Sequence, residues 1–219
     1  MAYSVDDVIQ PALRGVDRQS SWELVRLLDA DIEPVTTDEA KTHLRGLEGI
    51  TADDDYIDTL IATARNLVED YSGHVLIEQT WQLRFLGYHF NEIKLRRAPI
   101  IAVQSFVYDA AGVATTLAAS NYDLDGALSR WPRVIPSYGG VWPGSTFDPP
   151  AVIQFRAGYA DRTGSPTEGA EKVPVLFKHA IKLWIAHLYA FRGDEGKQVE
   201  PPMAVQALLR RHRAELGFA

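Results

Sequence analysis

Apolar positions repeat with a helical period in two separated parts of the chain. Residues 54–73 and 173–191 each carry an apolar side chain every three or four positions, which predicts two long amphipathic helices. A capping-box sequence at 36–39, Thr-Thr-Asp-Glu, predicts the start of a shorter helix, and the apolar spacing after residue 202 predicts another. We expect the large apolar residues of the two long helices to form one buried core: Leu60, Ile61, Leu67, Phe177, Ile181 and Trp184.

Between these helical segments the period changes to two residues. Residues 79–160 contain short runs in which apolar and polar side chains alternate, which predicts antiparallel strands. A segment at 136–150 rich in Gly, Pro and aromatic residues predicts a long ordered loop in this unit. The expected fold is therefore α+β: residues 35–78 and 170–219 form a bundle of about four main helices, and a small antiparallel β unit is inserted between them.

The first part of the chain is set apart from these helices. Pro11 interrupts the helical spacing of its first apolar residues, and Trp22, Val25 and Leu28 follow with a second short stretch of helical spacing. We expect residues 1–34 to be an N-terminal extension that is partly helical or flexible.

Composition contributes mainly by excluding classes of function. The 219 residues include no cysteine, which excludes disulfides, Cys-ligated zinc and thiol nucleophiles. The 22 Lys and Arg against 29 Asp and Glu give a formal net charge of −7, unlike the basic balance of a nucleic-acid binder. No apolar run approaches the roughly 20 residues of a membrane span, and the first residues lack the apolar core of a signal peptide. We therefore expect a soluble protein retained where it is made.

For each candidate catalytic or metal-binding motif, a purely structural role explains the residues better. Residues 121–126 match the start of an EF-hand calcium loop, but the twelfth position is Pro132 instead of glutamate, so a turn between strands is the favoured interpretation. The six histidines include no i, i+4 pair, and no serine-nucleophile sequence is present. We expect no enzymatic activity, no metal and no cofactor. Two alternatives stay open at this point: a small carbohydrate-active hydrolase with carboxylates beside the aromatic loop, and a β-rich adhesion module.

Several segments, taken in order, resemble the head–tail connector (adaptor) family of tailed phages, which also occurs in phage-like gene transfer agents. The resemblance covers about residues 34 to 213. Its segments are Pro34 to Arg45, Asp54 to Arg65, Tyr71-Ser72-Gly73 with Gln79-Thr80-Trp81, Leu95 to Pro99, Ile135 to Pro143, Phe155 to Tyr159, and Val173 to Leu209.

The resemblance implies a structural role. Members of this family form a dodecameric ring beneath the portal of a filled capsid, extend the DNA channel and present a surface for the next neck or tail protein. The implied partners are other copies of the chain, the portal protein and the next neck or tail-terminator protein. DNA would pass through without sequence-specific binding, and no membrane is involved. The implied location is the virion neck, after synthesis in the host cytoplasm.

Two surfaces are candidates for contacts in such an assembly. The basic end of the last helix is the candidate portal contact, because its charge would steer it to an acidic partner; it comprises Leu209, Arg210, Arg211 and Arg213. The aromatic loop is the candidate contact with a neighbouring subunit or neck protein, because exposed aromatic side chains are enriched at interfaces; it comprises Tyr138, Trp142 and Phe147.

Overall fold

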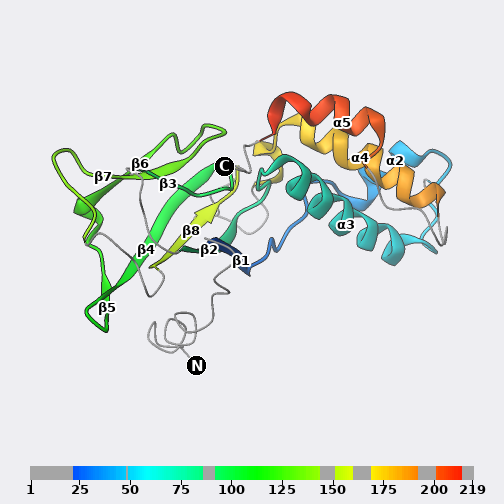
Figure 1. Cartoon of the computed structure of the whole chain (residues 1–219). Coiled ribbons are helices and arrows are strands. Elements are labelled where there is room, and N and C mark those ends of the chain that lie inside the picture. Colours follow the sequence, from blue (N-terminus) through cyan, green and yellow to red (C-terminus); the bar gives the residue numbers. More distant parts are fainter. Residues whose placement is uncertain are drawn as a thin grey trace.

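A helical part and a β part lie side by side in the molecule (Figure 1). The computed structural model describes residues 22–47, 49–85, 92–143, 151–159, 169–191 and 201–213. The α+β class expected from the sequence is confirmed. Within the described part of the chain, no helix combines the length and apolar character that a membrane span requires.

Among the described residues, four α-helices form the helical part. They are α2 (Thr37–Leu44), α3 (Asp54–Ser72), α4 (Val175–Ala190) and α5 (Met203–Leu209), and short 3-10 helices cover Ala119–Asn121, Ala170–Lys172 and Arg210–His212. Helices α2, α3 and α4 contact one another, and α5 packs on α4.

The ends of α2 and α3 follow directly from the sequence. The hydroxyl of Thr36 accepts a hydrogen bond from the backbone N–H of Glu39, and the Glu39 carboxylate accepts one from the N–H of Thr36, so the expected capping box is confirmed. Helix α3 ends at Gly73, whose φ of 73° places it in the left-handed region that favours glycine.

The apolar faces of the four helices bury one core. Its largest buried side chains include Trp184 and Phe177, and α5 contributes Val205 and Leu209. The six residues expected there fall as follows: Leu60, Ile61, Phe177, Ile181 and Trp184 are buried, whereas Leu67 is half-buried at the edge.

The β part consists of two antiparallel sheets. The five-stranded sheet has the order β1-β2-β8-β4-β5, and the three-stranded sheet has the order β3-β7-β6. The strands are β1 (Trp22–Leu28), β2 (Gln79–Phe85), β3 (Ile93–Lys94), β4 (Ile100–Ala110), β5 (Val113–Thr116), β6 (Tyr122–Asp125), β7 (Arg133–Pro136) and β8 (Ala151–Ala157).

The β part has a core of its own, so the expectation of a small inserted unit was wrong. Trp81, Leu83 and Phe85 alternate along β2 and pack with Phe106 and Phe155 from β4 and β8. A five-stranded sheet with one face against a second sheet can bury large aromatic side chains without help from the helices. The described residues therefore form two hydrophobic cores instead of one.

The first described segment also corrects an expectation. Residues 22–28, expected to be helical from the spacing of their apolar residues, form strand β1, which pairs antiparallel with β2 from Trp22↔Phe85 to Leu28↔Thr80. Pairing with a preformed neighbour overrides a weak local period in so short a segment. Residues 1–21 lie outside the described part of the chain.

The helical core yields the first prediction. Trp184→Ala removes a side chain that is 1% exposed and should lower the free energy of unfolding by about 3–5 kcal/mol, measured by urea denaturation. Val175→Ala is the matched control, because Val175 lies on the same helix and is 79% exposed. An unchanged stability for Trp184→Ala would refute the helical core as described.

Candidate assembly surfaces and the junction that positions them

A buried arginine joins the segment before α2 to helix α3. The Arg65 side chain on α3 is 3% exposed. Its Nε donates to Glu33 Oε2 at 2.9 Å, and its Nη1 donates to Asp29 Oδ1 and to Glu69 Oε2, each at 3.2 Å. Asp29 and Glu33 lie between β1 and α2, so the guanidinium fixes the path of this segment against α3.

The partner carboxylate, Glu69, joins the same helix to the sheet. Its Oε1 accepts the backbone N–H of Leu76 at 2.8 Å, and its Oε2 accepts Gln79 Nε2 at 2.9 Å, at the start of β2. Burial raises the pKa of the Glu69 carboxyl, and the attraction to Arg65 with these hydrogen bonds offsets only part of the rise. Burial alone would lower the pKa of Arg65, but its carboxylate partners raise it, so the guanidinium stays charged.

These contacts of Arg65 and Glu69 form a junction between the helical part and the β part. Directly after Gly73 in the sequence, an aromatic contact adds to this junction. The Nδ1 atom of His74 lies 2.8 Å from the Tyr159 hydroxyl, and the two rings stack with an interplanar angle of 8°. The ring of Phe177, on α4, lies 5.1 Å from that of His74. Burial lowers the pKa of His74 to about 4, so the imidazole is neutral near pH 7.

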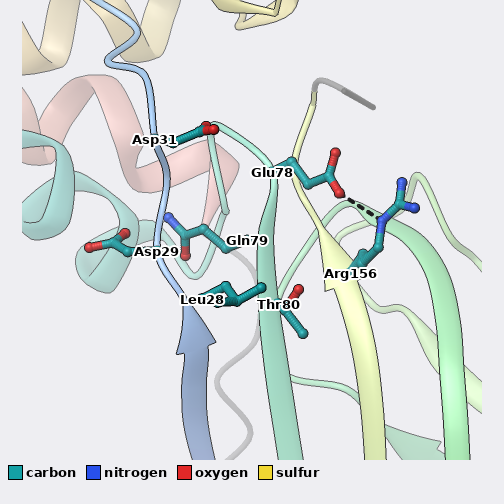
Figure 2. Close-up of a pocket in the computed structure, with 7 residues that line it drawn as sticks. All are labelled: Leu28, Asp29, Asp31, Glu78, Gln79, Thr80 and Arg156. Carbon is teal, nitrogen blue, oxygen red and sulfur yellow. Dashed lines mark ion pairs between the residues drawn. The ribbon is translucent and has the colours of Figure 1, made fainter. Parts of the chain in front are cut away.

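A pocket of about 470 Å³ lies between the end of β1, the start of β2 and strand β8 (Figure 2). Its lining residues are Leu28, Asp29, Asp31, Glu78, Gln79, Thr80 and Arg156. Arg156 is paired with Glu78, with 2.7 Å between Nε and Oε1. The lining contains three carboxylates, one guanidinium and no histidine, and two of the carboxylates are held in ion pairs: Glu78 with Arg156, and Asp29 with Arg26 and Arg65.

The remaining candidates for chemistry have structural partners. Asp125, in the calcium-loop lookalike, ends strand β6 and accepts Arg133 Nε at 2.7 Å. His43 and His179 form an edge contact 6.2 Å between ring centroids, and His89 lies outside the described residues. Over the ranges that the structure describes, no three His, Asp or Glu side chains are grouped to hold a metal ion.

The basic C-terminal turn is docked on its own subunit. Leu209 is fully buried against the helices, so the expectation that it contributes to a partner contact is corrected. Arg210, Arg211 and Arg213 are exposed. The carbonyl of Arg211 accepts Arg130 Nη1 at 2.5 Å, which ties this turn to the β part.

The aromatic loop divides into an exposed tip and an inner anchor. Tyr138 is fully exposed, and Val141 is 86% exposed. Trp142 packs on the β core, with 5.6 Å between its ring centroid and that of Phe106. Phe147 lies outside the described residues. Of the three expected contact residues, Tyr138 is therefore the one that the described surface presents to a partner.

Comparison of the sequence with protein-family profiles and with curated proteins gives no match. Comparison of the fold with solved structures gives matches that cover most of the chain. A chain from the "Neck of empty GTA particle computed with C6 symmetry" is 24% identical, with a TM-score of 0.68, and the match covers 88% of this chain and 95% of that one. A chain from the "Virion of native gene transfer agent (GTA) particle" is 24% identical, with a TM-score of 0.70 over 87% of this chain and 95% of that one.

A third match has the same coverage. It is a chain from the "Neck of native GTA particle computed with C12 symmetry", 23% identical with a TM-score of 0.62, covering 88% of this chain and 95% of that one. The protein thus has the fold of chains found in gene transfer agent particles, two of them in the neck. This agrees with the resemblance to head–tail connectors.

The buried network leads to a stability prediction. Arg65→Met leaves the Glu69 carboxylate buried without its cation and should lower the free energy of unfolding by about 3–5 kcal/mol in urea denaturation at pH 7. Asp70→Ala is the control, because Asp70 pairs with Arg97 at a site where its side chain is 72% exposed, and it should change stability by less than about 1 kcal/mol. Equal, small effects of both changes would show that the network does not hold the junction.

His74 leads to a pH prediction. Its folded pKa of about 4 lies below the ordinary 6.5, so its contribution is complete above about pH 6.5 and is lost as pH falls toward 4. Between pH 7 and pH 5 the wild type should lose about 2 kcal/mol more stability than His74→Gln. Glu33 and Glu69 have raised pKa values, which change stability with pH in the opposite direction. Their titration is present in both proteins, so it cancels when the wild type is compared with His74→Gln. Parallel pH profiles for the two proteins would contradict the assignment.

Proposed function

We propose that this chain is a head–tail connector subunit, a structural protein of the neck of a phage or gene transfer agent virion. In this role it forms a ring beneath the portal, extends the DNA channel and carries the attachment surface for the next neck or tail protein. The observation that supports the proposal most strongly is the fold match, because it spans 95% of the neck chains and includes particles of C12 and C6 symmetry.

Charge supports a channel role. Each subunit has a formal net charge of −7, so twelve copies would carry a formal charge of 12 × −7 = −84. An acidic ring repels DNA phosphates and lets DNA move through without adhering, whereas a basic ring would bind it. Sequence-specific recognition of DNA is not part of this function.

The proposed portal contact is the exposed basic turn formed by Arg210, Arg211 and Arg213. These residues carry positive charge on an acidic subunit, and their backbone is held in place by Arg130 and by the buried Leu209. A rigid basic turn would be steered to an oppositely charged partner and would set its register. Arg213 also lies over the Tyr71 ring, 4.9 Å from its centroid, so Arg210 and Arg211 are the better candidates for direct contact.

Assembly mass tests the proposal. Native mass spectrometry of the chain, alone and mixed with its portal protein, should detect a closed ring, and twelve times the subunit mass of 24.4 kDa is the expected size. Portal protein should increase the ring fraction, because it supplies a template. A chain that stays monomeric at all concentrations, with and without portal, would contradict a connector role.

The portal contact has its own test. Arg210→Glu with Arg211→Glu should give folded protein that no longer joins portal-bearing heads, because two attractive charges become repulsive. Lys94→Glu with Lys172→Glu is the matched control, since it reverses two exposed positive charges elsewhere and changes net charge equally. Head attachment would be measured by co-sedimentation. Wild-type attachment of the arginine variant would refute the contact.

A further inference from the structure

Helix α5 has an outer face without charge. It lies along the upper edge of the view in Figure 1, and it packs on α4. Val205 and Leu209 are buried against the core, whereas Met203 is 86% exposed and Ala204 and Ala207 are exposed. A surface helix normally carries charged side chains opposite its buried face. None of the seven residues of α5 is charged, so an apolar surface faces outward.

The polar side chain of α5 is engaged within the subunit. Gln206 is the only polar residue of the helix, and its Nε2 donates to the carbonyl oxygen of Pro201 at 2.7 Å. The outer face of Met203–Leu209 consequently offers a partner apolar contacts and no side-chain charge.

Positive charge begins where this face ends. Helix α5 continues directly into the 3-10 helix Arg210–His212, and Arg210 and Arg211 are exposed. Within the described part of the chain, neither guanidinium has an ion pair. Met203, Ala207 and Arg210 are three or four positions apart, so the apolar face and the charged end are continuous. We call this the outer α5 surface: Met203, Ala204, Ala207, Arg210 and Arg211.

The chemistry of the outer α5 surface selects its partner. A helix has its backbone N–H and C=O groups paired internally, so its side offers no edge to which an extended strand could add. Exposed alanines allow another helix to approach closely, at an interaxial distance of about 8–10 Å. The two guanidinium groups require carboxylates at the corresponding end of that helix.

A second copy of α5 does not meet this requirement. Pairing of two outer α5 surfaces would supply apolar contacts, but α5 and its 3-10 extension contain no carboxylate. The guanidinium groups of both copies would then enter the interface without partners, which is costly. Charge therefore disfavours twofold pairing of α5 and favours a helix that carries carboxylates.

We propose that the outer α5 surface receives an amphipathic helix of the portal protein. Its apolar side chains pack on Met203, Ala204 and Ala207, and its carboxylates lie at the end that meets Arg210 and Arg211. This inference rests on the proposed portal contact and states the chemistry of the portal segment that makes it. The apolar part supplies affinity, and the charged end sets the direction in which the helix lies.

Ala207→Arg tests close packing on this surface. The longer side chain would separate the two helices and should lower co-sedimentation with portal-bearing heads by about tenfold or more. Because the change adds positive charge, attraction between charges alone predicts unchanged or stronger attachment. Thr63→Arg is the matched control, since Thr63 is exposed on α3 and the charge change is equal. Wild-type attachment of a folded Ala207→Arg protein would overturn the proposal.

A single cysteine tests the same surface without added bulk. The chain contains no cysteine, so Ala207→Cys introduces a unique thiol. A maleimide should label this thiol about tenfold more slowly on portal-bearing heads than in the free chain or in rings without portal. Thr63→Cys is the control and should be labelled equally in rings and on heads. Equal labelling of Ala207→Cys in those two states would show that portal does not cover α5.

Cross-linking identifies the occupant. A photoactivatable maleimide on the thiol of Ala207→Cys, in chains attached to portal-bearing heads, should cross-link to the portal protein. Mass spectrometry should locate the link in a segment with apolar residues every three or four positions and with Asp or Glu near one end. A link to a second copy of the chain, or to a portal segment without this pattern, would refute the assignment.

The outcomes separate this inference from the proposed function. If the wild type neither forms a ring nor joins portal-bearing heads, the connector role fails, and the inference fails with it. If the wild type joins heads while the Ala207 variants attach normally and stay fully labelled, the connector role stands and the assignment of the outer α5 surface is wrong.

Discussion

The buried guanidinium of Arg65 is the constraint on which the arrangement of this protein depends. A charge that is 3% exposed is tolerated only with close carboxylate partners, and here three of them come from two parts of the chain. Asp29 and Glu33 fix the segment between β1 and α2, and Glu69 extends the network to Leu76 and Gln79 at the start of β2. One charged cluster therefore sets the position of the helical part relative to the sheet.

This junction also fixes the segments next to it. Because Asp29 is held by Arg65, β1 ends in a defined place beside the pocket that Asp31 and Glu78 line. On the other side, the buried Leu209 and the Arg130 contact hold the basic C-terminal turn beside the turn at 128–131. In the proposed ring, a rigid junction would keep small errors in angle from accumulating around many copies.

The helices and their ends were predicted from the sequence, because interactions between residues a few positions apart determine them. The period of α3 and α4, the capping box at Thr36 and the left-handed stop at Gly73 are all visible within a few residues. Strand β1 was missed because its partner β2 lies more than 50 residues away, and its own apolar spacing favours a helix. The Arg65–Glu69 spacing of four was readable, but the contacts with Asp29 and Glu33 arise only from the tertiary fold. The burial of Leu209 was missed because a narrow apolar stripe does not reveal which helix covers it.

The central claim is that this chain forms the ring between portal and tail. Electron cryo-microscopy of particles assembled with and without the chain tests it most directly, at the portal vertex. The account predicts a twelvefold ring of density directly below the portal that fits this fold and disappears when the chain is omitted. Particles that lack the chain but keep an unchanged ring and neck, or density for the chain elsewhere on the particle, would contradict it.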